Sequence, residues 1–382
     1  MPAFRSLALL PVVLAAACAT VAADQLIVVG TQLKTPGHGF SIVRFDAEAG
    51  TLRAPEFVLE SPAPVFSVLH PDGRHLYVCQ GVHELAGRRT GVLGAYAIDS
   101  ATGRPTLLNL QPTGGGETTH VSLDHTGRFL FTASYDGGNV AAFRLEADGR
   151  IAERTAFVQH KGHGPRSDRQ ESAHPHSIFA DPTNRFVLVP DLGLDKVLVY
   201  RFDTQTGGLT PHTPAAFDLP PAAGPRHLAW HPDGRHVYVV NELANSVTSL
   251  DWDAAVGTFS AIQTLPTLDA GFHGTNTAAE IAVHPTGRFL YVSNRGTENC
   301  LTVYAIDAAT GKLTFVERVS SRGKRPRNFA LTVDGRWLFV TNYESDNASL
   351  FRVDPATGRL SPVGDPVHLP VPYGIAILPA AR

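Results

Sequence analysis

One pattern of hydrophobic and polar positions recurs along most of the chain: a short apolar run, a polar turn and a second apolar run. The six copies are SVLHPDGRHLYV, VSLDHTGRFLFT, SIFADPTNRFVLV, HLAWHPDGRHVYV, EIAVHPTGRFLYV and NFALTVDGRWLFV. Their apolar runs alternate or are rich in β-branched and aromatic residues, whereas helical repeats would place apolar residues three and four apart. Each copy therefore predicts part of a small antiparallel sheet.

Every copy carries an arginine in its turn, and these arginines recur at intervals of roughly 50 residues, enough for four short strands and their turns. The turn arginines are Arg74, Arg128, Arg185, Arg235, Arg288 and Arg336. Six repeats leave LIVVGTQ and FSIVRFD near the N-terminus and YGIAILP near the C-terminus. Strands from the two ends would complete a seventh sheet, and a closed ring removes unpaired sheet edges. The sequence thus predicts an all-β, seven-bladed β-propeller with one blade closed by strands from both termini.

The beginning of the chain differs from the repeats and has the features of an export signal. Arg5 supplies a positive charge, Leu7–Ala17 form an apolar stretch, and small residues precede Asp24. This stretch is too short to cross a bilayer comfortably. We expect residues 1–23 to be a signal peptide, residues 24–382 to form the propeller as one domain, and the protein to be exported, either to the periplasm or outside the cell.

Charge and cysteine content narrow the possible partners. The formal net charge of −3 and the pI near 6.6 give no general attraction to nucleic acid or to an anionic membrane, so any anion site must be local. Cys18 makes a lipoprotein the less favoured alternative, because a bulky residue three places earlier is missing. Cys79 and Cys300 can pair only with each other in the mature chain, and we expect buried free thiols. The motifs of serine hydrolases, P-loops and dinucleotide-binding folds are absent, and we expect no cofactor.

Aligning the repeats on the turn arginine shows which residues surround the central channel. In a propeller the inner strand of each blade starts at the face where the second strand ends. The starts of the inner strands supply two rings of residues: Val65, Thr119, His176, Arg226, Ala279 and Arg327, then Phe66, His120, Ser177, His227, Glu280 and Asn328. Two arginines and several histidines at one channel mouth are typical of an anion-binding site.

The ends of the second strands supply a further ring, mostly of short polar residues, for which an architectural role is the simpler interpretation. These are Gln80, Ser134, Asp191, Asn241, Asn294 and Asn342. Directly after this ring, Glu242 and Arg295 depart from the pattern and are candidate functional residues.

The longest insertion runs from His160 to Ser177 and is either a functional loop or a plain solvated one. It carries Arg169, Gln170, Glu171, His174 and His176. His174 and His176 are spaced like metal ligands, but no third ligand follows them, so we expect no metal site.

GPRHLAWHPDGRHVYVVNEL, RQESAHPHSI, DLGLDKVLVYRFD and HPTGRFLYVSNRG resemble the lactonase propellers typified by bacterial 6-phosphogluconolactonase. The resemblance covers nearly all of residues 26–380 and extends to a fungal carboxy-cis,cis-muconate lactonizing enzyme. In that group a histidine, two arginines and a glutamate in the channel are the proposed active-site groups. By motif, the resemblance implies four catalytic residues: His176 in HPHS, Arg226 in GPRH, Glu242 in NEL and Arg327 in RPRN. The accompanying candidates for substrate binding are His120, His174, His227 and Arg295.

The resemblance implies hydrolysis of an anionic sugar-acid lactone in the central channel. Arg226 and Arg327 would hold an anionic group or polarise the carbonyl, and His176 or Glu242 would activate water. A glutamate beside arginines has a lowered pKa and is a weak base, which favours His176 as the base and Glu242 as its orienting partner. Two alternatives stay open: a non-catalytic ligand- or protein-binding propeller of the cell envelope, and a lactonising lyase acting on an unsaturated dicarboxylate.

Overall fold

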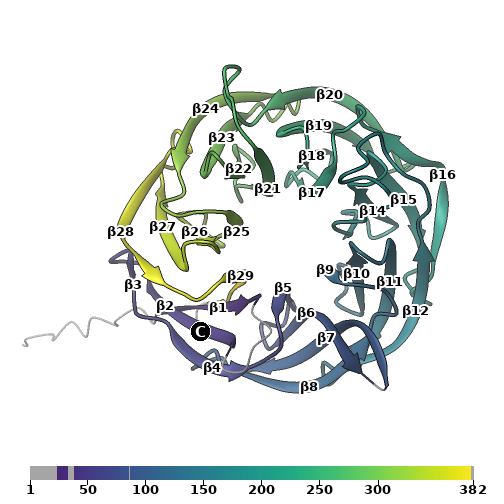
Figure 1. Cartoon of the computed structure of the whole chain (residues 1–382), viewed down its shortest axis with the longest axis horizontal. Helices are drawn as coiled ribbons and strands as arrows, with labels where there is room; N and C mark the ends of the chain where they lie inside the picture. Colours follow the sequence, from purple (N-terminus) through teal and green to yellow (C-terminus); the bar gives the residue numbers. More distant parts are fainter. Residues whose placement is uncertain (1–23, 33–37, 86, 380–382) are drawn as a thin grey trace, which may run out of the picture.

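The computed structural model describes residues 24–32, 38–85 and 87–379, so the predicted signal peptide and Cys18 lie outside the described residues. Within these ranges every regular element is a β-strand, and no helix capable of crossing a membrane is found there. Seven antiparallel sheets form a ring around a central channel (Figure 1). The predicted all-β, seven-bladed propeller is therefore confirmed.

Six blades consist of four consecutive strands, with the first strand at the channel and the last at the rim (Figure 1). The first three of them comprise β5 (Pro64–Leu69), β6 (His75–Leu85), β7 (Arg88–Ile98) and β8 (Pro105–Pro112); β9 (Thr118–Leu123), β10 (Phe129–Ser134), β11 (Asn139–Leu145) and β12 (Ile151–Gln159); β13 (Phe179–Ala180), β14 (Phe186–Asp191), β15 (Lys196–Phe202) and β16 (Leu209–Asp218). The other three comprise β17 (Pro225–Trp230), β18 (His236–Asn241), β19 (Ser246–Asp253) and β20 (Thr258–Pro266); β21 (Asn276–Val283), β22 (Phe289–Gly296), β23 (Cys300–Ile306) and β24 (Leu313–Ser320); β25 (Pro326–Leu331), β26 (Trp337–Asn342), β27 (Asn347–Val353) and β28 (Leu360–His368).

The remaining blade is built from both ends of the chain, as predicted. Its strands are β29 (Pro372–Ile377), β1 (Gln25–Thr31), β2 (Gly39–Asp46), β3 (Thr51–Leu52) and β4 (Glu56–Glu60). β29 lies at the channel and pairs with β1, with Ile377 opposite Ile27 and Ala376 opposite Val28. The ring is thus closed by main-chain hydrogen bonds between the two ends of the chain.

Apolar side chains join each blade to the next. Seven buried clusters occur in the described residues, and each contains residues of two neighbouring blades. At the closing junction, Phe45 of β2 meets Trp337 of β26 edge to face, with ring centroids 5.3 Å apart. No blade buries its apolar faces alone, which explains why the repeats need one another.

The turns between first and second strands add polar ties between blades. The His231 Nε2 atom lies 2.9 Å from the carbonyl oxygen of Gly287 in the next blade, and His284 Nε2 lies 3.0 Å from that of Gly335. Gly287 has a φ of 74°, and a Cβ atom there would lie 2.5 Å from His231 Nε2. Glycine is therefore required by the backbone conformation and by the close approach of the histidine.

The blade containing β13 has the shortest inner strand, and the long loop occupies the space before it. Pro175 forms a single bridge with Asp191, and His176 donates its backbone N–H to Pro190 at 3.0 Å. Asp191 also accepts a hydrogen bond from the backbone N–H of His174 at 2.8 Å. The second half of the loop is largely buried, so the alternative of a plain solvated loop is wrong for this half.

The ring of short polar residues has the architectural role that the sequence favoured. Asn241 Nδ2, for example, donates to the hydroxyl groups of Ser246 and Thr248, each at 3.0 Å. Cys79 and Cys300 are both buried and free, as expected.

Candidate active site

Irregular pairing in the inner strands directs side chains into the channel. The ladder between β17 and β18 skips Arg226, and the ladder between β25 and β26 skips Arg327. In β21, Ala279 and Glu280 together lie opposite a single residue, Ser293. Such β-bulges commonly re-aim side chains near functional sites. The inner-strand positions that the sequence alignment placed around the channel coincide with these bulges. The bulges explain why the side chains at these positions meet in the channel.

Glu242 is the centre of a buried charge cluster. Its Oε1 atom accepts a hydrogen bond from Arg169 Nη2 at 2.7 Å, and its Oε2 atom accepts one from Arg295 Nη2 at 2.9 Å. Arg226 Nε lies 3.1 Å from the same Oε2 atom. Burial alone would raise the pKa of Glu242, but the three arginines outweigh it and lower the pKa to about 2. Glu242 is therefore ionised at neutral pH and is a weak base.

Arg226 and Arg327 supply positive charge close to this cluster. Burial, and then repulsion by Arg327 and Arg295, lowers the pKa of Arg226 to about 9, so Arg226 stays charged at neutral pH. Its Nη1 atom donates to the carbonyl oxygen of Ala279 at 2.6 Å. The guanidinium carbon of Arg327 lies 4.9 Å from the ring centroid of Tyr373. Among the residues that the structure describes, no carboxylate forms a salt bridge with Arg327, so its charge is available to a ligand.

His176 faces Glu242 without a direct hydrogen bond. Its Nε2 atom is 3.9 Å from Glu242 Oε2, beyond hydrogen-bond distance. Burial, and then repulsion by Arg226 and His227, holds the pKa of His176 well below its usual value of 6.5, so the imidazole is neutral at pH 7. Within the described ranges its Nδ1 atom has no hydrogen-bond partner. The ring thus has one buried nitrogen whose hydrogen-bonding capacity is unused.

A pocket of about 390 Å³ lies at the channel mouth, a size found for small-molecule sites. Four of the eight predicted site residues line it: His176, Glu242, Arg295 and Arg327. Arg226 lies deeper and lines an adjoining cavity of about 20 Å³. The structure thus brings all four predicted catalytic residues together with Arg295.

The other three predicted binding residues do not line the pocket. His174 stacks on Tyr135, with ring centroids 4.3 Å apart, and thereby supports the pocket wall. His120 and His227 lie deeper, with ring centroids 5.1 Å apart, and burial holds the pKa of each well below 6.5. Direct contact of these three with a substrate stays a prediction.

Three residues of the site were not selected from the sequence. Arg169 contacts Glu242 from the long loop, where no repeat provides an alignment. Tyr373 belongs to β29, which is not followed by a turn arginine and so falls outside the register. Glu280 stood in the ring of inner-strand residues, but nothing in the pattern distinguished it.

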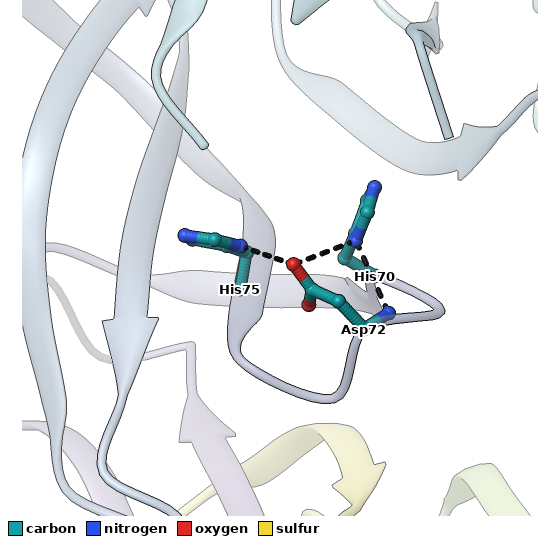
Figure 2. Close-up of side chains that lie close together, drawn as sticks. All are labelled: His70, Asp72 and His75. Atoms are coloured by element: carbon teal, nitrogen blue, oxygen red, sulfur yellow. Dashed lines mark hydrogen bonds and ion pairs between the residues drawn. The ribbon is translucent and has the colours of Figure 1, made fainter. Parts of the chain in front are cut away.

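Two clusters in turns have the composition of a metal site and lie at the other end of the inner strands. Figure 2 shows the first, in which His70 Nδ1 and His75 Nδ1 lie 3.1 and 2.7 Å from Asp72 Oδ2. The second contains His231, Asp233 and His236. His70 Nε2 also lies 3.1 Å from the carbonyl oxygen of Gly127 in the next blade, so it makes the same tie as His231 and His284. These structural contacts account for both clusters, and we infer no metal from them.

Comparison with known proteins agrees with this fold. Residues 26–377 match the family model described as "Lactonase, 7-bladed beta-propeller". The chain therefore belongs to the seven-bladed lactonase propeller family, and the predicted resemblance is confirmed.

Individual relatives match over most of their length. The 6-phosphogluconolactonase of Bacillus subtilis is 33% identical over 350 residues, which cover 92% of this chain and 97% of that protein. The 6-phosphogluconolactonase of Serratia proteamaculans is 34% identical over 316 residues, or 82% and 88% of the two chains. Among solved structures, the periplasmic gluconolactonase of Pseudomonas aeruginosa is similar with a TM-score of 0.88 and 33% identity, covering 94% of this chain and 100% of that chain.

Proposed function

We propose that this protein is a carboxylic-ester hydrolase that opens the lactone ring of a sugar acid in the channel pocket. The observation that carries the proposal is the uneven sharing of charge in the site. Glu242 is held by Arg169, Arg295 and Arg226, whereas Arg327 has no carboxylate partner among the described residues and lines the pocket. The pocket is thus prepared for an oxygen-rich ligand that carries or develops negative charge.

The arrangement suits attack of water on a lactone carbonyl. Arg226 and Arg327 both line the small cavity at the inner end of the pocket, where they can stabilise the oxyanion that forms on the carbonyl oxygen. Glu242 holds Arg226 and Arg295 in place rather than taking a proton, because its pKa is about 2. His176 lies at the pocket wall, where its neutral imidazole can bond to the substrate.

The substrate is an aldonolactone, and its phosphorylation state depends on where the protein acts. The relatives are named for 6-phosphogluconolactone and for gluconolactone. The signal peptide predicted over residues 1–23 would carry the chain away from the cytoplasm, where sugar phosphates are made. This favours the unphosphorylated lactone.

Hydrolysis of a lactone panel by the chain beginning at Asp24 tests the proposal. The panel contains gluconolactone, 6-phosphogluconolactone and a simple aliphatic lactone, each corrected for spontaneous opening. We expect acceleration of at least one sugar lactone and a loss of roughly 100-fold or more in kcat/KM for Arg226→Ala. Arg235→Ala, at an exposed turn arginine paired with Asp251, is the matched control and should leave the rate unchanged. Rates equal to the blank across the panel would contradict the proposal and favour a binding propeller.

A further inference from the structure

A second buried carboxylate, Glu280, lines the small cavity, whereas Glu242 lines the larger pocket. Glu280 belongs to the bulge of β21, and its side chain is 10% exposed. Its Oε1 atom accepts hydrogen bonds from His227 Nδ1 at 2.9 Å and from the backbone N–H of Ile281 at 3.1 Å. Its Oε2 atom has no hydrogen-bond partner within the described part of the chain. One carboxylate oxygen is thus fixed by two donors, and the other is buried without a partner.

This carboxylate faces a space suited to one water molecule. Glu280, Arg226 and Arg327 all line the cavity of about 20 Å³. A cavity needs roughly 10–15 Å³ of such volume to hold a water, and the water needs polar partners, which these three residues provide. Thr119, Arg327 and Tyr373 line both this cavity and the larger pocket, so the cavity is the inner end of the pocket. A lactone in the pocket would confine the water beneath its carbonyl.

Burial with few compensating contacts makes Glu280 a better proton acceptor than Glu242. Arg226 and His227 face it from β17, His120 from β9 and Arg327 from β25, and Glu117, directly before β9, lines the same cavity. Burial outweighs the attraction of the two arginines and raises the pKa of Glu280 above its usual value. Arg226 Nη1 donates instead to the carbonyl oxygen of Ala279, and no salt bridge between Arg226 and Glu280 is present among the described residues. Glu280 thus keeps the basicity that Glu242 loses to three arginines.

We propose that Glu280 is the catalytic base of the lactone hydrolysis, an inference that rests on the proposed function. Its carboxylate takes a proton from the confined water while the water oxygen bonds to the carbonyl carbon. The carbonyl oxygen becomes an oxyanion that faces Arg226 and Arg327. The bond between the carbonyl carbon and the ring oxygen then breaks, and the ring oxygen takes the proton from Glu280. The carboxylate is regenerated, and the product is the open-chain hydroxy acid.

In this mechanism His227 is a positioning residue. Its bond to Oε1 holds the carboxylate of Glu280 beside the cavity, and its Nε2 atom has no hydrogen-bond partner in the described residues. His227→Asn should therefore lower kcat less than loss of the carboxylate does. It should also shift the acid limb of the kcat profile along the pH axis, because the base loses its hydrogen-bond donor.

Glu280→Gln tests the base directly, because glutamine keeps the shape and can still accept the bond from His227. We expect kcat on the best sugar lactone to fall roughly 100-fold or more, with KM changed by less than about twofold. We also expect the acid limb of the pH profile to disappear. Glu280→Asp keeps a carboxylate and should retain the acid limb of the pH profile at a reduced kcat. It replaces Glu280→Gln as the test if circular dichroism shows that the glutamine variant folds poorly. Glu153→Gln, at an exposed glutamate of β12, is the matched control and should match the wild type.

The outcomes separate this inference from the function itself. If the wild type hydrolyses sugar lactones but Glu280→Gln keeps kcat within about threefold together with the acid limb, Glu280 is not the base and the proposed function stands. Loss of the limb in His176→Asn instead would assign the role to His176. A wild type that does not exceed the blank on any lactone overturns both.

Discussion

Three guanidinium groups surround Glu242, whose side chain is 3% exposed. Removing several charges from water has a large cost, and it is recovered only if the charges compensate one another. The carboxylate of Glu242 is what allows Arg169, Arg226 and Arg295 to lie together inside the channel. Its role in the pocket is therefore electrostatic as well as structural.

Glu242→Gln is expected to destabilise the protein by about 3–5 kcal/mol near neutral pH, because it leaves three cations without their shared anion. The pKa of Glu242 is about 2 in the folded chain against an ordinary value near 4.5. Its contribution is therefore fully present above pH 4.5 and is lost as the pH falls through 4.5 towards 2.

Urea unfolding of wild type and variant at several pH values checks this expectation, since the gap between them should narrow across that window. Glu153→Gln, which breaks an exposed pair with Arg144, should cost less than about 1 kcal/mol. A gap that does not change with pH would show that the charge of Glu242 is not what stabilises the cluster.

The position of a residue within its repeat decides whether the sequence could predict it as part of the site. His176, Arg226 and Arg327 share one position relative to their turn arginines, so the alignment places them at one channel mouth. Arg169 and Tyr373 lie outside any repeat, and their contacts depend on how the loop and the C-terminal strand fold back. Glu280 occupies the ring as an ordinary member. Its unpartnered oxygen and the adjoining cavity can be recognised only in the three-dimensional structure.

At the scale of elements, the same turn serves different purposes in different blades. The residue after the turn arginine is aromatic in four blades, with Phe129, Phe186, Phe289 and Trp337 packing under a glycine of the next blade. His75 and His236 take this place in the other two. The turn is thus a contact between neighbouring blades. Glycine is required where a side chain of the adjacent blade packs against the backbone.

Three glycine-to-alanine variants separate the causes of this requirement. Gly271 has open space around it and an ordinary φ, so Gly271→Ala should change stability by less than about 0.5 kcal/mol. Gly364 has a φ of 61° but no neighbour within 4 Å, so its replacement should cost about 1 kcal/mol. Gly287 combines a φ of 74° with His231 at 2.5 Å, and Gly287→Ala should cost clearly more than Gly364→Ala. Equal urea midpoints for the last two variants would mean that the tie through His231 is unimportant.

For the whole molecule, closure of the ring depends on a strand from each end of the chain. β1 lies between β29 and β2 and pairs with both. Ile27, Val28 and Val29 of β1 are almost fully buried and belong to the clusters that join this blade to its two neighbours. The folded unit should therefore need β1, and we expect its N-terminal boundary directly before this strand.

Two shortened chains test this boundary. The chain 24–382 keeps every strand of the ring and should unfold in one cooperative transition as a soluble protein. The chain 32–382 lacks β1, which leaves β29 and β2 as unpaired edges and removes four buried apolar side chains worth about 1.5–3 kcal/mol each. We expect it to be unfolded or aggregated by circular dichroism and size-exclusion chromatography, with no lactone hydrolysis. If 32–382 melted at the same temperature as 24–382, the seventh blade would not be what closes the ring, and the channel site would have to be held by the other six blades alone.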